Sequence, residues 1–198
     1  ASGTQRSQRR PHALVMSPDD PMGRLFVGVA LTDDARAATA AHLGPLSPLP
    51  GRPAPPNNWH FTLRFLGPTT ALQFERLLHG LSELPKSLSL RLGGLGAFPK
   101  TQRANVLWLG LEESSAELVA LAALAEESAV AAGFSPEERP FHPHVTLSRL
   151  RPPHDLRTLV GSIGPLGLRM PVEAVTIFRS NSEPGGVRYE ALEALELR

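Results

Sequence analysis

Short apolar runs and polar–apolar alternation recur along the chain and predict strands, with 3.6-residue apolar spacing between some of them that predicts helices. We predict strands over residues 25–30, 60–66, 87–98, 105–111, 141–150, 166–178 and 186–195. We predict helices after Thr32 to about His42, over 69–84, from Ser114/Ser115 to Gly133, and over 155–160. The helices come singly between strand pairs. An α+β fold with mainly antiparallel sheets is therefore expected, rather than a doubly wound parallel sheet.

Two stretches fall outside this pattern. Six prolines between residues 45 and 56 predict a stiff, exposed connection without regular structure. Residues 1–21 are rich in Ser, Gln, Arg and Pro and have no apolar periodicity, so we interpret them as an N-terminal extension to a single domain over 22–198. The extension lacks the apolar core of a secretory signal, and no stretch approaches ~20 apolar residues. We expect a cytoplasmic protein without a membrane segment.

Composition narrows the chemistry more than the fold. The 198 residues are 41% hydrophobic and 20% charged, which is typical of a soluble globular chain. The absence of cysteine excludes disulfides, thiolate nucleophiles, iron–sulfur clusters and zinc ribbons. A net charge of +1 does not indicate a strongly polyanion-binding surface. All but two of the 20 cations are arginine, which suits bidentate phosphate contacts but also fits a biased genome.

One short element occurs twice. The segment His60-Phe61-Thr62-Leu63-Arg64-Phe65-Leu66 matches His144-Val145-Thr146-Leu147-Ser148-Arg149-Leu150 at four of seven positions. Each copy begins a predicted strand after a proline-containing stretch. Because side chains at i and i+2 share a strand face, each copy presents an imidazole beside a hydroxyl. The duplication makes a cleft between two related halves plausible.

Two such pairs suit acid–base attack on a phosphodiester. With an ordinary pKa near 6.5, one imidazole can accept a proton while the other donates one. Threonine hydroxyls can donate hydrogen bonds to phosphate oxygens. We therefore predict His60 and His144 as catalytic residues and Thr62 and Thr146 as phosphate-binding residues, with no cofactor and no metal. A single His-x-Thr would be uninformative, since half-solvated strands often carry one.

The paired motifs resemble the signatures of the two-histidine phosphoesterases. Further similarity to the RNA 2′,3′-cyclic phosphodiesterases, or 2′-5′ RNA ligase-like proteins, lies in four segments over residues 24–197. These are Leu25-Phe26-Val27, Asn58-Trp59 through Gly67, Val106-Leu107-Trp108-Leu109-Gly110, and Phe178-Arg179-Ser180 with Gly186-Val187-Arg188-Tyr189-Glu190.

The resemblance implies a bilobal, pseudo-twofold α+β fold in which two mainly antiparallel sheets face a central cleft, with helices on the outer faces. It also implies hydrolysis of an RNA 2′,3′-cyclic phosphate to a 2′-phosphate, with His60 as acid and His144 as base. Reverse 2′-5′ ligation would use the same groups. The expected partner is RNA with a cyclic phosphate end; tRNA halves, other RNA fragments, 2′-5′ linked oligonucleotides and small cyclic nucleotides stay open. We expect a monomer.

Four further residues are candidate substrate contacts. Arg149 stands where the family often carries arginine, but strand parity turns it away from His144 unless the strand bulges. Arg64 has the parity of His60 and could touch the RNA backbone, although exposed strand arginines are common. Phe26 and Ser180 occupy family-like positions near the cleft. An aromatic there could stack on a base, but core packing is the commoner role of such a phenylalanine.

Two alternatives remain open from the sequence. His142 lies two residues before His144, so His60, His142 and His144 could form a metal site of a metal-dependent phosphoesterase. Against this, no Asp or Glu has obvious ligand spacing, and the repeat duplicates His-x-Thr rather than His-x-His. The second alternative is a non-catalytic module that binds RNA ends.

Overall fold

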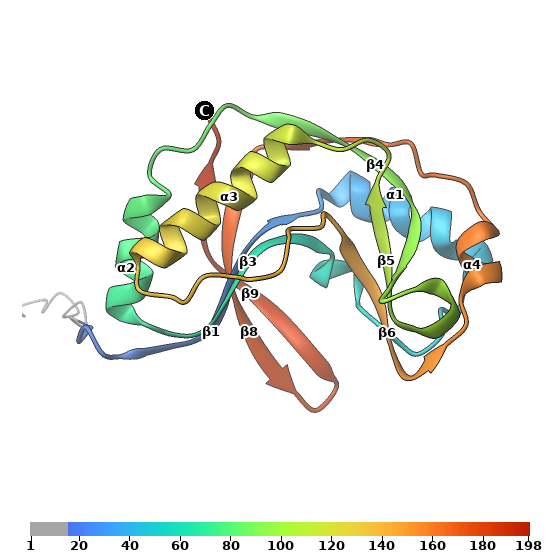
Figure 1. Ribbon diagram of the computed structural model, residues 1–198, viewed down its shortest axis with the longest axis horizontal. Coiled ribbons are helices and arrows are strands. Elements are labelled where there is room, and N and C mark those ends of the chain that lie inside the picture. Colours follow the sequence, from blue (N-terminus) through green and yellow to red (C-terminus); the bar gives the residue numbers. More distant parts are fainter. Residues whose placement is uncertain (1–15) are drawn as a thin grey trace, which may run out of the picture.

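The computed structural model describes residues 16–198 and confirms an α+β fold built on antiparallel strands (Figure 1). The strands are β1 (Pro21–Ala30), β2 (Arg52–Pro53), β3 (His60–Thr70), β4 (Leu88–Phe98), β5 (Ala104–Leu111), β6 (Val145–His154), β7 (Arg169–Val172), β8 (Ala174–Glu183) and β9 (Gly186–Glu196). The helices are α1 (Asp33–Leu43), α2 (Ala71–Gly80), α3 (Ala116–Ala131) and α4 (Arg157–Gly161), with 3₁₀ turns η1 (Gly44–Leu46), η2 (Pro56–Asn58) and η3 (Thr101–Arg103).

The expected two sheets are joined into one. Within residues 16–198 the strands form a nine-stranded sheet in the order β7-β4-β5-β6-β3-β1-β8-β9, with β2 added at β6. Its two four-stranded halves meet between β3 and β6, where the ladder of the described chain has one residue pair, Phe61 with Val145. These residues directly follow His60 and His144. The join between the halves therefore lies beside the repeated motifs.

Side-chain caps fix where the longer helices begin. The Thr32 hydroxyl accepts the amide of Ala35 at α1, and Ser115 caps α3 in the same way. Thr70 and Gln73 form a capping box at α2. Figure 1 shows α2 and α3 together at one end of the molecule, with α1 and α4 toward the other. The caps thus define the first residue of each of these helices.

The core lies between the sheet and these helices. Its members are apolar residues from alternating strand positions and from one face of each helix, and Val27, Phe61, Leu107 and Val145 are fully buried among them. Burying such a side chain contributes about 1.5–3 kcal/mol. This core fixes the backbone from which the motif residues project.

Each motif-bearing strand contains a bulge at the same place in the repeat. In β3, Leu63 is an extra residue opposite the neighbouring Val27 and Gly28 of β1. In β6, Leu147 is an extra residue opposite the neighbouring positions of β5. A bulge shifts the side-chain alternation of the residues that follow it. Strict parity therefore fails in both copies of the repeat.

Several predicted boundaries were wrong. The predicted stop at Gly67-Pro68 does not occur, because Gly67 adopts φ +76° at a ladder irregularity and β3 continues to Thr70. The helix predicted over 69–84 is accordingly α2, Ala71–Gly80. The strand predicted over 141–150 begins only at Val145, and Pro140 and Pro143, which lack an N–H, precede it. The proline-rich connection is not wholly irregular, since it contains β2, η1 and η2.

The chain before β1 contacts the domain. The carbonyl of Asp20 accepts the amide of Ala71 at 2.9 Å, and that of Pro18 accepts the amide of Leu72 at 3.0 Å. β1 begins at Pro21, one residue before the predicted domain boundary, and the rest of the predicted extension, residues 1–15, lies outside the described residues. No helix in the described part of the chain is long and apolar enough to span a membrane.

Candidate active site

The two repeated histidines are oriented by the same hydrogen bond. His60 Nδ1 lies 2.6 Å from the carbonyl oxygen of Asn58, and His144 Nδ1 lies 2.8 Å from that of His142. A carbonyl can only accept, so each Nδ1 carries the proton and donates it. In the neutral ring each Nε2 is then the free, basic nitrogen.

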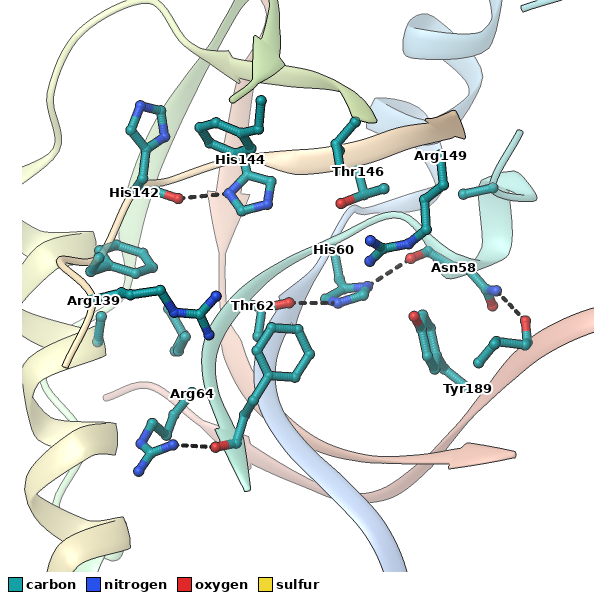
Figure 2. Close-up of a pocket in the computed structure, with 18 of the residues that line it drawn as sticks. Asn58, His60, Thr62, Arg64, Arg139, His142, His144, Thr146, Arg149 and Tyr189 are labelled. Atoms are coloured by element: carbon teal, nitrogen blue, oxygen red, sulfur yellow. Dashed lines mark hydrogen bonds between the residues drawn. The ribbon is translucent and has the colours of Figure 1, made fainter. Parts of the chain in front are cut away.

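Both rings face one cavity of about 1450 Å³ together with the two threonines (Figure 2). His60 Nε2 lies 2.9 Å from the Thr62 hydroxyl, which donates to it. Thr146 occupies the matching position beside His144 on β6. The structure thus brings together all four residues of the predicted catalytic and phosphate-binding set, and they can surround a small tetrahedral anion with two nitrogens and two hydroxyls.

Aromatic rings pack against each imidazole. Phe26 stacks on His60 with ring centroids 4.7 Å apart, and Tyr189 meets it edge-on at 5.1 Å. Phe98 meets His144 edge-on at 4.9 Å. These contacts exclude water from one side of each ring and restrict its rotation.

Burial lowers the basicity of both imidazoles. It lowers the pKa of His60 from 6.5 to about 4, with further lowering by the nearby charges of His144 and Arg149. The pKa of His144 is also lowered, mainly by burial and also by His142 and Arg149. Both rings of the ligand-free protein are therefore neutral at pH 7. A bound anion would favour protonation, since it stabilises an imidazolium.

The bulges place the two candidate arginines differently from strict strand parity. Beyond the bulge in β6, Ser148 is buried and Arg149 is exposed, so Arg149 lines the same cavity as His144. The corresponding pair in β3 is Arg64, which is buried, and Phe65, which is 54% exposed. The bulge in β6 is the exception that the parity argument against Arg149 allowed, whereas Arg64, which strict parity favoured, is buried.

Arg64 makes its contacts within the protein. It lies at the wall of the cavity, where it forms an ion pair with Glu126 of α3 and donates to the carbonyls of Phe65 and Ser135 (Figure 2 shows the bond to Phe65). A guanidinium with three protein partners is held in place by them. Its position supports α3 against β3 rather than the predicted contact with RNA.

Phe26 and Ser180 do not line the histidine cavity. Phe26 is 2% exposed and is enclosed by His60, Phe178 and Tyr189. It therefore packs against the imidazole, as the commoner core role implies, and has no open face for stacking on a base. Ser180 lies with Phe26 around a separate small pocket and pairs with Tyr189 across the β8–β9 hairpin.

The third histidine lies in the cavity but its ring is apart from the pair. The centroid of His142 is 6.3 Å from that of His144, and the ring packs edge-on against Phe98 at 5.1 Å. Over residues 16–198 no three His, Cys, Asp or Glu side chains converge as metal ligands. The donor set around the paired histidines consists of hydroxyls and arginines, which suits an anion rather than a cation.

Sequence reasoning did not assign the roles that several residues have in the site. Asn58 and His142 supply the orienting carbonyls, and Tyr189, Phe65 and Arg52 also line the cavity. A signal was present for Asn58 and His142, which stand two residues before each histidine. The repeat itself also aligns Phe65 with Arg149.

Paired His-x-Thr strands that meet at the centre of one antiparallel sheet define the class of two-histidine phosphoesterases. The sequence model of the 2′-5′ RNA ligase superfamily matches residues 30–184. The chain therefore belongs to the 2′-5′ RNA ligase superfamily.

Individual proteins show the same similarity. The RNA 2′,3′-cyclic phosphodiesterase of Thermus thermophilus is 33% identical over 189 residues, which cover 88% of this chain and 90% of that protein. The protein of the same name from Escherichia coli is 32% identical, with 86% and 94% covered. The structure of E. coli LigT complexed with 3′-AMP superposes with a TM-score of 0.77 at 28% identity, covering 90% of this chain and 99% of that one.

Proposed function

We propose that the protein hydrolyses RNA 2′,3′-cyclic phosphate ends to 2′-phosphates by metal-independent acid–base catalysis at His60 and His144. The observation that carries this proposal is the matched orientation of the two imidazoles. Each Nδ1 is held by the carbonyl two residues earlier, so each Nε2 is turned to the shared cavity, where that of His60 accepts from the Thr62 hydroxyl until a phosphate takes this place. The names of the similar proteins from T. thermophilus and E. coli agree with it.

The reaction moves two protons and exchanges one P–O bond. His144 removes a proton from water as the water oxygen bonds to phosphorus, and the bond from phosphorus to the 3′ oxygen breaks. His60 protonates that departing oxygen, which leaves a 3′ hydroxyl and a 2′-phosphate. The low pKa of His60 makes its imidazolium a strong proton donor once the substrate anion has brought it into the protonated state.

The remaining groups stabilise charge on the phosphate. Thr62, Thr146 and Arg149 can donate to the non-bridging oxygens, where negative charge concentrates in the transition state. The reverse path would join a 5′ hydroxyl to the cyclic phosphate as a 2′-5′ bond with the same residues. Selection of tRNA halves, the monomeric state and the cytoplasmic location stay predictions.

The test is turnover of an RNA with a 2′,3′-cyclic phosphate end in excess EDTA. We expect full activity in EDTA and a 2′-phosphate product. His60→Ala and His144→Ala should each lower kcat by roughly 10²–10⁴-fold, while His79→Ala, which removes an exposed imidazole on α2, should not. Activity lost in EDTA would indicate a metal-dependent phosphoesterase. Tight binding of the RNA end without turnover would indicate a binding module.

A further inference from the structure

The short strand β2 places a second arginine directly opposite Arg149. β3 pairs with β6 at Val145, and β2 pairs with β6 further along, at Ser148 and Arg149. In this ladder Arg52 is directly opposite Arg149. Directly opposed residues of antiparallel strands have Cβ atoms about 4.5–5.5 Å apart. Both arginines line the cavity that contains the paired histidines.

The chain around Arg52 is held firmly in this position. The amide of Ala54 donates to the carbonyl of Leu147 at 2.8 Å, and the buried Ser148 hydroxyl donates to the carbonyl of Pro50 at 2.5 Å. Between them Gly51 adopts φ +79°, and a Cβ there would lie 2.5 Å from the carbonyl oxygen of Arg149. The turn therefore fits tightly against β6 and delivers Arg52 to a fixed place.

Within the described part of the chain, no carboxylate pairs with Arg52 or Arg149. Like charges directly opposite on neighbouring strands destabilise a sheet. Among residues 16–198, neither arginine forms an ion pair or a side-chain hydrogen bond. Two such arginines, placed opposite each other by the backbone, are stabilised when an anion lies between or beside the guanidinium groups.

The opposite end of the cavity is different. There Arg64 is paired with Glu126, and Arg139 is paired with Glu137 at 3.1 Å. Arg188, which also lines the cavity, is 3.9 Å from Glu183, so among the described lining residues the arginines without a carboxylate partner are on the β2–β6 side. The volume of about 1450 Å³ also exceeds the roughly 300–1,000 Å³ typical of small-molecule sites, so there is room beyond one cyclic nucleotide.

We propose that Arg52 binds the 5′-phosphate of the nucleotide that carries the cyclic phosphate, so that the enzyme selects an RNA end over a free nucleoside 2′,3′-cyclic phosphate. This inference rests on the proposed function. Arg149 is assigned to the reacting phosphate, since it lies on the strand of Thr146 and lines the cavity that both imidazoles face. Arg52 lies across the ladder from it, away from His144 and Thr146 along β6, and is placed to meet the next phosphate of the chain.

The experiment compares cytidine 2′,3′-cyclic phosphate with its 5′-phosphorylated form. The measured quantity is the ratio of kcat/KM for the 5′-phosphorylated substrate to that for the unphosphorylated one. We expect the wild-type protein to prefer the 5′-phosphorylated substrate and Arg52→Gln to lower this ratio about tenfold, as expected for one charged hydrogen bond. Arg52→Lys should retain part of the preference. Arg76→Gln, which removes an exposed arginine of α2 outside the cavity, should keep the wild-type ratio.

A ratio unchanged in Arg52→Gln, or an equal loss on both substrates, would overturn the assignment. Binding of the products gives a second measurement that does not need turnover. Cytidine 2′-phosphate with and without a 5′-phosphate is titrated into both proteins by calorimetry, and Arg52→Gln should lose the affinity that the 5′-phosphate adds. Absence of turnover on either substrate by the wild-type protein would count against the proposed function, while the titration still decides the role of Arg52.

Discussion

Acidification should destabilise the folded protein through His60. The pKa of this imidazole is about 4 in the folded protein, whereas an unfolded chain has the ordinary value of 6.5. Between these values the unfolded state binds a proton that the folded state does not. The free energy of unfolding therefore falls as the pH is lowered from 6.5 to 4, and this contribution of His60 is fully present only above 6.5.

The size of the effect follows from the two pKa values. Each unit of difference is about 1.4 kcal/mol, so the full loss below pH 4 is about 3 kcal/mol. By pH 5 most of it, about 2 kcal/mol, is already lost. This is a large part of the 5–15 kcal/mol typical of a folded domain. His144 has a lowered pKa as well, so the whole protein should lose more than this.

Urea denaturation at pH 7 and pH 5 isolates the contribution of His60. The wild-type protein should lose about 2 kcal/mol more than His60→Gln between the two conditions, because His144 titrates in both. His154→Gln is the matched control, since it removes an exposed imidazole with the same bond from Nδ1 to the carbonyl two residues earlier. Equal losses in the wild-type protein and His60→Gln would refute the reasoning.

Two further predictions concern packing and charge. Gly96→Ala should destabilise the protein by about 1–3 kcal/mol, because its Cβ would lie 2.1 Å from the Trp108 indole, whereas the Cβ of Gly94→Ala meets nothing within 4 Å. Thermal midpoints of Gly96→Ala and Gly94→Ala that agree within about 2 °C would contradict this. Arg149→Gln should lower kcat/KM about 10–100-fold with little change in Tm, and Arg64→Gln should lower Tm more than turnover. The opposite ranking in melting and activity assays would show that the bulges do not set these roles.

Much of the fold followed from local patterns. Strand alternation, the caps at Thr32 and Ser115 and the single helices between strands predicted an α+β architecture with antiparallel strands. Boundaries were less accurate where tertiary pairing overrode local signals. Gly67-Pro68 has the composition of a stop, yet pairing with β1 carries β3 past it. The sequence around Arg52 and Pro53 has no alternation typical of a strand. These residues form β2 because they pair with β6.

The core of the site was predictable because it is repeated. His60, Thr62, His144 and Thr146 precede the bulges, so period-two alternation holds for them. Alternation fails from Leu63 and Leu147 onward, because each is the extra residue of a bulge. A bulge depends on pairing with the neighbouring strand, which the local sequence pattern does not show. For Phe26 the sequence left core packing and base stacking open. The ring is buried against His60, which strand alternation alone does not indicate.

The single pair at Phe61 and Val145 has a mechanical consequence. His60 and His144 each stand one residue before this pair, on opposite halves of the sheet. The separation of the two imidazoles therefore depends on the angle between the halves, while the internal ladders of each half do not depend on it. Because Phe61 and Val145 are fully buried, we expect a change of side-chain volume there to alter the distance between the imidazoles without changing either ring.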